Sequence, residues 1–170
     1  MSYGSAGAGS TPHLAGELFK QQAGFFATHI PYRGAAPALQ DLLAGQLDYY
    51  FDPGIAFPHV RAGKLKMLAV ASSKRSALFP EVPTLAEAGL KGFDIGTWFG
   101  VLAPAATPKE IVARLSAETM KIIHSPEFRK RMDEIGAEPI GDTPEQMARQ
   151  IKEETEKFAR LVKEAKVTIE

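Results

Sequence analysis

The stretch that decides the fold runs from Phe25 to Phe51 and reads FFATHIPYRGAAPALQDLLAGQLDYYF. Its first six residues, 25–30, are apolar and rich in strand formers, and Pro31 ends that run. Residues 38–44 have the apolar spacing of a helix, and residues 47–51 are again typical of a strand. A strand, a helix and a strand in so short a stretch predict a parallel βαβ unit, and therefore an α/β fold.

Small residues occupy the turn between the first strand and the helix of this unit. Gly34, Ala35 and Ala36 fall where the first helical N–H groups have no partner within the helix. These groups and the helix dipole favour an anion, so a carboxylate or phosphate would suit the turn. Many such turns bind only water or a neighbouring side chain, so both interpretations stay open from this turn alone.

A second turn of the same kind lies upstream, in the segment SAGAGSTPH at residues 5–13. A hydroxyl residue before Pro12 predicts a helix start, and Gly24 predicts its end. The segment departs from the G-x-G-x-x-G pattern, no lysine follows it as in a P-loop, and we expect no complete strand before it, so a nucleotide site is not favoured. Two helix N-termini facing one cleft could instead hold the two ends of a small dianion.

After residue 51 the predicted elements are first mixed and short, and then consecutive helices. Asp52 begins a turn at the end of a predicted strand, the edge where ligands bind in open α/β sheets. Residues 55–62 predict a short helix, residues 65–71 the strongest strand of the chain, and residues 84–87 a capping box that opens another short helix. Three further helices, each announced by a hydroxyl residue before a proline, begin near Thr107, Ser125 and Thr143.

Composition narrows the function classes. The 170 residues, 45% of them hydrophobic, suffice for one domain or two small lobes. Twenty basic residues balance twenty acidic ones, so neither nucleic acid nor an anionic membrane is favoured as a partner. There is no cysteine, no G-x-S-x-G serine and no metal-ligand spacing among the four histidines, so we expect no catalytic residue, metal or cofactor.

Several blocks of the sequence together resemble one family. These are S-x-G-x-G-x-x-P-H-L at residues 5–14, IPYRG-x-x-PA at 30–38, LAV at 68–70 with Lys74-Arg75, PTL-x-E-x-G at 83–89 and WFG at 98–100. In order and spacing they are similar to the solute receptors of tripartite tricarboxylate transporters, the Bug family. The resemblance extends from about Ser2 to Ala165.

The resemblance implies a periplasmic, non-enzymatic receptor with the two-lobed fold of type II periplasmic binding proteins, the Venus flytrap. Such a receptor closes on a small mono-, di- or tricarboxylate and delivers it to the permease subunits of the transporter. In the family the two turns described above bind the ligand carboxylate, largely through backbone N–H groups. Carried over, the ligand-binding residues are Ser5, Gly7, Gly9, Ser10, Thr11, His13, Tyr32, Gly34, Ala35, Ala36 and Asp52.

One departure from the family shapes our other expectations. The export signal and the opening part of the first lobe should precede Ser2, so the chain resembles a C-terminal fragment that would stay in the cytoplasm as written. Residues 1–96 would form a nearly intact second lobe, and residues 97–170 the returning strand and C-terminal helices of an incomplete first lobe. The apolar faces of those helices would then favour a homo-oligomer.

Two other functions stay open beside a carboxylate receptor. The chain could be a ligand-free structural fragment that only oligomerises. It could also be an α/β enzyme acting on an anionic substrate, although no nucleophile and base are paired in the sequence.

Overall fold

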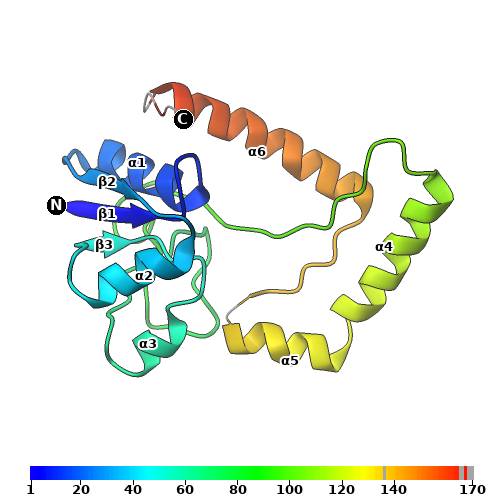
Figure 1. Ribbon diagram of the computed structural model, residues 1–170, viewed down its shortest axis with the longest axis horizontal. Helices are drawn as coiled ribbons and strands as arrows, with labels where there is room; N and C mark the ends of the chain where they lie inside the picture. The colour runs from blue at the N-terminus through cyan, green and yellow to red at the C-terminus, as the bar shows by residue number, and fades with distance from the viewer. Residues whose placement is uncertain (136, 165–166, 168–170) are drawn as a thin grey trace. The chain divides into compact units, whose positions relative to one another are not determined.

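A computed structural model of the chain describes residues 1–135, 137–164 and 167 (Figure 1). The chain divides into two compact units, one formed by residues 1–97 together with 157–170 and one formed by residues 98–156. We call them the α/β unit and the helical unit. The assignment of residues 1–96 and 97–170 to two lobes stays a prediction.

The α/β unit is built on a three-stranded parallel sheet with the order β2-β1-β3. Its strands are β1 (Ser2–Ser5), β2 (Thr28–Pro31) and β3 (Tyr49–Tyr50). Its helices are α1 (Thr11–Ala23), α2 (Ala35–Leu43) and the short α3 (Phe57–Arg61). The strand–helix–strand unit predicted from residues 25–51 is confirmed, although both of its strands are shorter than expected.

The central strand is β1. It directly precedes residues 6–10, which we call the glycine loop, so the expectation that no complete strand precedes this loop was wrong. Tyr3 pairs with His29 of β2 on one side and with Tyr49 of β3 on the other. The segment contains glycine and serine and has little intrinsic strand propensity, so its conformation comes from pairing along both edges. Gly4 allows close packing there, because a Cβ atom at this position would lie 2.6 Å from Leu47 Cδ1 and would force that side chain to move.

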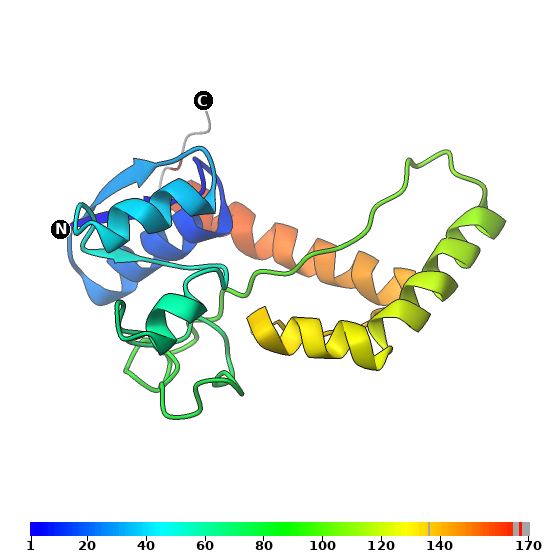
Figure 2. The same cartoon turned by 60° about the horizontal axis from the view of Figure 1, so that its bottom comes forward.

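Helices α1 and α2 cover opposite faces of the sheet (Figures 1 and 2). The side chain of Tyr3, fully buried, faces α1, where a Cβ added to Gly16 would lie 2.1 Å from the Tyr3 ring. The next residue, Gly4, faces α2, where its nearest neighbours include Ala38. Successive strand residues point to opposite faces, so this alternation defines a three-layer α/β/α arrangement.

The core of the α/β unit gathers residues that are far apart in sequence. Its buried members are Leu14, Ala15, Phe93, Ile95 and Leu161. Phe158 and Val162 of α6 (Pro144–Glu164) pack against this cluster. These two side chains of a C-terminal helix therefore complete a core that the chain itself forms.

Residues 65–71 do not form the strand that their composition predicts. Only Val70 pairs, in an isolated parallel bridge with Thr84, while Leu68 is exposed. Strand propensity stabilises a ladder only where a neighbour offers its N–H and C=O groups, and no described strand lies beside residues 65–69. The capping box at Thr84 forms, but a turn follows it rather than a helix.

The helical unit contains α4 (Lys109–Ile123), α5 (Pro126–Ile135) and the first part of α6. The three helices predicted from their proline starts are confirmed. Neither α4 nor α5 buries any residue, and Ile111, Leu115 and Ile122 stay exposed on α4. None of the described helices is both long and apolar enough to cross a membrane.

Candidate functional site

Three loops meet at the carboxyl edge of the parallel sheet. They follow β1, β2 and β3 at residues 6–10, 32–34 and 52–54, and parallel pairing brings the ends of all three strands to the same side. The first two loops lie against each other, because a Cβ on Gly7 would be 3.5 Å from the carbonyl oxygen of Tyr32. This edge is where open α/β sheets bind ligands.

The loop after β1 uses several of its own backbone donors. The Gly7 N–H donates to Ser5 Oγ (3.1 Å), and the Ser10 N–H donates to the Gly7 carbonyl oxygen (3.2 Å). The Gly9 N–H donates to Nδ1 of His13 at 3.0 Å. Gly7 and Gly9 adopt φ values of 135° and 77°, a region that favours glycine. These predicted site residues therefore shape the loop rather than offer free donors.

The first turn of α1 retains donors that no described residue uses. Ser10 is the N-cap, but its hydroxyl donates to the Gly7 carbonyl oxygen (2.7 Å) and makes no capping bond. Pro12 has no N–H, so the donors of this turn are the amides of Thr11 and His13. Neither amide has a hydrogen-bond partner in the part of the chain that the structure describes.

The N-terminus of α2 is more open. Gly34 is its N-cap with φ of 118° and carries no capping side chain. The amides of Ala35 and Ala36 follow, and no described residue accepts a hydrogen bond from either. The side chains of these two residues are single methyl groups. The loop before them is anchored by Tyr32, whose N–H donates to the Ser5 carbonyl oxygen (3.1 Å).

The hydroxyl of Tyr32 is engaged away from the loop backbone. It donates to Oδ2 of Asp41 on α2 at 2.7 Å, and this hydrogen bond, with smaller effects of burial and the Asp41 charge, raises the pKa of Tyr32. Its role in the structure is to tie the loop to α2. A direct contact of this hydroxyl with a ligand stays a prediction.

Asp52 caps the turn after β3. Its Oδ2 atom accepts hydrogen bonds from the amides of Gly54 (2.7 Å) and Ala56 (2.9 Å). Its Oδ1 atom is buried and has no partner among the described residues. Burial raises the pKa of this carboxyl, and the two backbone donors and His59 oppose the rise only in part.

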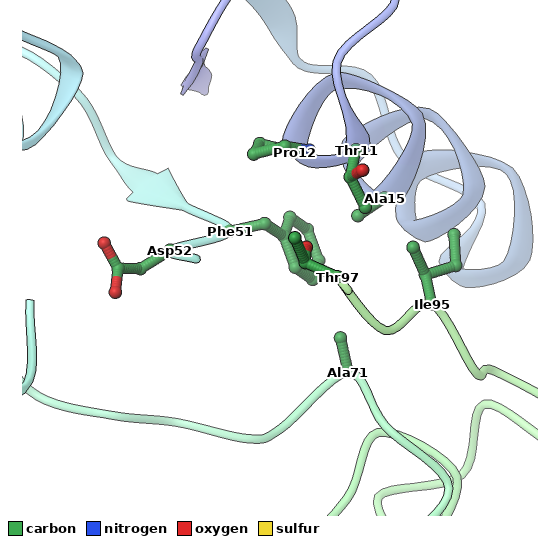
Figure 3. Close-up of a pocket in the computed structure, with 8 residues that line it drawn as sticks. All are labelled: Thr11, Pro12, Ala15, Phe51, Asp52, Ala71, Ile95 and Thr97. Carbon is green, nitrogen blue, oxygen red and sulfur yellow. The ribbon is translucent and has the colours of Figure 1, made fainter. Parts of the chain in front are cut away.

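A small hollow lies beside Asp52 at the sheet edge (Figure 3). Its lining comes from the start of α1, the end of β3 and two later segments: Thr11, Pro12, Ala15, Phe51, Asp52, Ala71, Ile95 and Thr97. Its volume of about 40 Å³ accommodates a few water molecules, whereas ligand cavities are typically several times larger. The hollow alone is therefore too small for a dicarboxylate.

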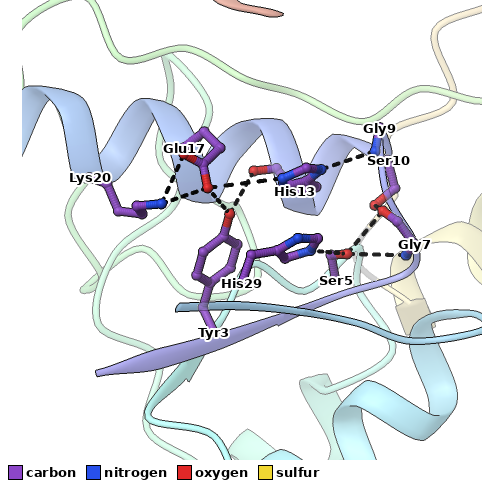
Figure 4. A network of polar contacts seen from close by, with 9 residues as sticks. All are labelled: Tyr3, Ser5, Gly7, Gly9, Ser10, His13, Glu17, Lys20 and His29. Carbon is purple, nitrogen blue, oxygen red and sulfur yellow. Dashed lines mark hydrogen bonds and ion pairs between the residues drawn. The ribbon is translucent and has the colours of Figure 1, made fainter. Parts of the chain in front are cut away.

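A polar network that the sequence analysis missed lies beneath the first loop (Figure 4). Glu17 of α1 accepts a hydrogen bond from the Tyr3 hydroxyl (2.5 Å) and pairs with Lys20 (2.7 Å). Two histidines, His13 and His29, stack beside them with ring centroids 3.7 Å apart. The sequence contains regular spacings that could have indicated this network. His13, Glu17 and Lys20 have helical spacing on α1, and Tyr3 and Ser5 are two residues apart on β1. Only the fold shows that these groups lie together.

The burial of this network changes its acid–base chemistry. Burial raises the pKa of Tyr3 strongly, and its hydrogen bond to Glu17 adds to that effect. Burial tends to raise the pKa of Glu17, but hydrogen bonds from Lys20 and Tyr3 outweigh it and leave the pKa lowered. Glu17 is thus a carboxylate that already has two partners. No group of three or more metal-ligating side chains occurs among the described residues.

Comparison with known proteins shows what the chain is similar to. The profile of the tripartite tricarboxylate transporter family receptor, TctC, matches residues 1–167. The chain belongs to this family. Among relatives of the family, a UPF0065 protein from the tcbD-tcbE intergenic region of Pseudomonas sp. (strain P51) is 40% identical over 96% of this chain and 49% of its own. Protein BugT of Bordetella pertussis is 37% identical over 92% of this chain and 48% of its own.

Solved structures of TctC and Bug proteins share the fold. The R. palustris protein Rpa4515, solved with adipate, has a TM-score of 0.93 and 37% identity over 100% of this chain and 57% of its own. The periplasmic binding protein BugD has a TM-score of 0.91 and 36% identity over 100% and 58%. MatC (Rpa3494) of Rhodopseudomonas palustris, with bound malate, has a TM-score of 0.85 and 36% identity over 95% and 56%. The predicted periplasmic-binding-protein fold class is thereby confirmed.

The TctC chain described here spans about half the length of the two relatives named above and of a third from Agrobacterium vitis. Family members include periplasmic binding proteins and solute receptors, as the resemblance in the sequence implied. Which residues contact a ligand stays a prediction for all eleven positions named from the sequence.

Proposed function

We propose that this chain supplies the carboxylate-holding α/β part of an extracytoplasmic solute receptor. The observation that carries the proposal is the pair of unpartnered amides at Ala35 and Ala36, beside the glycine loop that leads into α1. Backbone donors at a helix N-terminus stabilise an anion through hydrogen bonds and the helix dipole together. Relatives of similar fold, solved with adipate and with malate, support a carboxylate as that anion.

We assign the predicted site residues to two roles. The amides of Thr11, His13, Ala35 and Ala36 are the proposed donors to the carboxylate, since no described residue uses them. The remaining predicted residues shape or support the loops: Ser5, Gly7, Gly9, Ser10, Tyr32, Gly34 and Asp52. Backbone donors do not distinguish one carbon skeleton from another, so the proposed ligand class is a small mono-, di- or tricarboxylate.

The whole receptor would deliver its ligand to the permease of a tripartite transporter, and we propose the periplasm as its location, as for BugD. For the 170-residue chain alone we expect weak binding, because the hollow at the sheet edge holds only about 40 Å³. A ligand that this chain holds with fewer charge-assisted hydrogen bonds than a whole receptor loses about 1.5–3 kcal/mol of binding free energy per bond. The loss of two such bonds would weaken binding by roughly a hundredfold or more.

The test is a substitution that removes one donor and leaves the helix intact. Proline is favoured at the first helical position, and the extended ψ of 170° at Gly34 suits a residue before proline. The variant Ala35→Pro should therefore keep α2 but lose one N–H group. The matched control, Ala35→Ser, changes the side chain and keeps the donor.

Titration with adipate, malate and citrate, followed by NMR or calorimetry, separates the alternatives. We expect Ala35→Pro to weaken binding about tenfold or more while Ala35→Ser stays close to the unsubstituted chain. Equal affinities for both variants would contradict the proposed donors. No binding of any of these carboxylates would favour the ligand-free structural fragment, and turnover of an anionic substrate would favour the enzyme.

A further inference from the structure

Each of the stacked histidines beneath the glycine loop uses a ring nitrogen to contact either the loop itself or Ser5, the strand residue that precedes it. His13, in the first turn of α1, accepts the Gly9 N–H at Nδ1 (3.0 Å). His29, on β2, places Nε2 at 2.7 Å from Ser5 Oγ, and the same hydroxyl accepts the Gly7 N–H. The two rings lie 3.7 Å apart and 6° from parallel. The loop therefore rests on the edges of this pair (Figure 4).

The contact with Gly9 fixes the protonation state of His13. Because Nδ1 accepts a hydrogen bond, it carries no proton, and the proton of the neutral ring is on Nε2. That nitrogen lies 3.9 Å from Oε1 of Glu17. A second proton would have to bind Nδ1, where it would face the Gly9 N–H, donor against donor. The bond to Gly9 exists only while His13 is neutral.

The charged groups around the pair act in both directions on that second proton. The titratable side chains facing it are Tyr3 of β1, and Glu17 and Lys20 of α1. Glu17 is the only carboxylate among these groups, and it already pairs with Lys20 and accepts from Tyr3. An added charge on His13 would be attracted by Glu17 but repelled by the Lys20 ammonium, and it would also be buried beside a second imidazole.

Acid–base shifts agree with this geometry. Burial lowers the pKa of His13, with Glu17 opposing and Lys20 reinforcing the shift. Burial and the neighbouring His13 lower the pKa of His29 to about 4. Burial thus favours the neutral form of both rings, and protonation of His13 competes with its contact to Gly9.

We propose that His13 is a positioning residue, which as a neutral ring backed by His29 holds the glycine loop in place and releases it on acidification. Because the loop ends at Ser10, the N-cap of α1, its release would also reorient the first amides of that helix. That this weakens carboxylate binding rests on the proposed function, whereas the release of the loop does not. In this role His13 acts through Gly9 and need not touch the ligand with its ring.

The first experiment follows the ligand-free chain by NMR from about pH 8 to about pH 4.5, a range that brackets the ordinary histidine pKa and values below it. We expect the Gly9 amide resonance to move with the same midpoint as the His13 ring. In the variant His13→Asn the side-chain oxygen can accept in place of Nδ1 but does not titrate, so the Gly9 resonance should stay nearly constant.

A Gly9 amide that moves independently of His13 would overturn the proposal. So would a Gly9 amide that titrates equally in His13→Asn, with folding of the variant checked by circular dichroism. If that variant does not fold, the unsubstituted chain alone decides, since the midpoints of Gly9 and His13 either coincide or differ.

The second experiment tests the link to binding with adipate as the probe. Its affinity is measured for the unsubstituted chain and for His13→Asn at about pH 7.5 and about pH 5.5. Protonation of adipate itself affects both proteins equally, so it cancels in the ratio of their affinities. We expect the affinity of the unsubstituted chain, divided by that of His13→Asn, to fall about tenfold at the lower pH, because only the unsubstituted chain loses the loop contact.

An affinity ratio that stays constant would refute the coupling to binding. If neither protein binds adipate at either pH, it is the proposed function that fails, and the NMR titration still decides whether His13 holds the loop.

Discussion

Helices α1 and α4 share one sequence signal at their starts but lie in different surroundings. A Thr-Pro pair opens α1 at Thr11, and another immediately precedes α4, where Pro108 is the N-cap; the helices are 13 and 15 residues long. Yet α1 buries five consecutive residues, Pro12 to Gly16, whereas α4 buries none. Local signals therefore set where both helices begin, but only α1 has a sheet to lie on. Propensity forms a helix, and tertiary packing supplies most of its stability.

The same contrast holds for the two units as a whole. In the α/β unit, Tyr3 and Phe93 are almost completely buried, and side chains from α1 and the end of α6 share one core. In the helical unit, Leu115 is half exposed, and Phe99 and Val101 are more than four-fifths exposed. Apolar burial stabilises by about 25 cal/mol per Å², so the two units should respond differently to the loss of a large side chain.

The largest expected difference comes from truncating one apolar side chain in each unit. Phe93→Ala removes a ring that is 1% exposed and stacks on Phe51, which should lower the free energy of unfolding by about 3–5 kcal/mol. Leu115→Ala, at 50% exposure, should cost less than about 1 kcal/mol. Urea unfolding followed by circular dichroism measures both, while fluorescence of the single tryptophan, Trp98, reports the helical unit. Equal losses of unfolding free energy in the two variants would contradict the expected difference between the two units.

The exposed apolar face of α4 leads to the second prediction, self-association of the chain. Ile111, Leu115 and Ile122 follow a helical spacing and are 45%, 50% and 57% exposed. If this face is buried between two copies, the double variant Leu115→Lys/Ile122→Lys changes four side chains per dimer, so it should raise the dissociation constant by about ten-thousandfold at about 1.5 kcal/mol per side chain. Sedimentation equilibrium or light scattering at micromolar concentration measures it.

The α/β unit provides the control for this experiment. Ile55→Lys changes a side chain of similar exposure, 43%, that is not part of the helical unit. It should leave self-association unchanged. A monodisperse monomer for the unsubstituted chain would refute the expected homo-oligomer directly.

A smaller expected difference between the two units is in the pH dependence of stability. The pKa of His29 is about 4 in the folded chain against an ordinary value of about 6.5, so between these values the unfolded chain binds the extra proton. Stability should therefore fall as the pH drops from about 6.5 to about 4, by roughly 1–2 kcal/mol after allowing for the partial exposure of the ring. The slope of unfolding free energy against pH should flatten in His29→Phe, and persist in the control His124→Phe in the helical unit.

Much of the fold could be predicted from local sequence. Proline starts, glycine ends and apolar spacing located α1, α2 and the three C-terminal helices. The central strand β1 could not be found in this way, because its conformation depends on pairing with β2 and β3 rather than on its own residues. The opposite error at residues 65–71 has the same cause: strand formers without neighbouring strands do not make a ladder.

In the candidate site, too, local features could be predicted from the sequence, whereas contacts that depend on the folded chain could not. Sequence located the loops and the small residues at Ala35 and Ala36. It could not show that the side chains of Ser5 and His13 accept hydrogen bonds from the amides of Gly7 and Gly9, because these bonds depend on how the loop turns back. Nor could it show that His29, 16 residues beyond His13, stacks on it across α1 and β2.

The smallest predicted effect compares one motif placed in both units. Capping boxes form at Thr84 and at Thr143, each with two reciprocal hydrogen bonds. Thr84 N–H donates to Glu87 Oε2 (2.8 Å) and Glu87 N–H to Thr84 Oγ1 (3.0 Å). The Thr143 box with Gln146 has the same bonds at 2.8 and 3.2 Å. The local geometry is thus matched, and only the surroundings differ.

Burial should decide the cost of breaking each box. Thr84 is 3% exposed and lies next to the bridge with Val70, so Thr84→Ala removes both the acceptor of the Glu87 N–H and a buried side chain, and should cost about 1–2 kcal/mol of global stability. Thr143 is exposed, so Thr143→Ala lets water replace the lost bond and should cost about 0.5 kcal/mol, felt mainly as faster hydrogen exchange in the first turn of α6. The conservative changes Thr84→Ser and Thr143→Ser keep the acceptor and control for the methyl group. If both alanine variants destabilise equally, the cap rather than its burial determines the cost, and the two units do not differ in this respect.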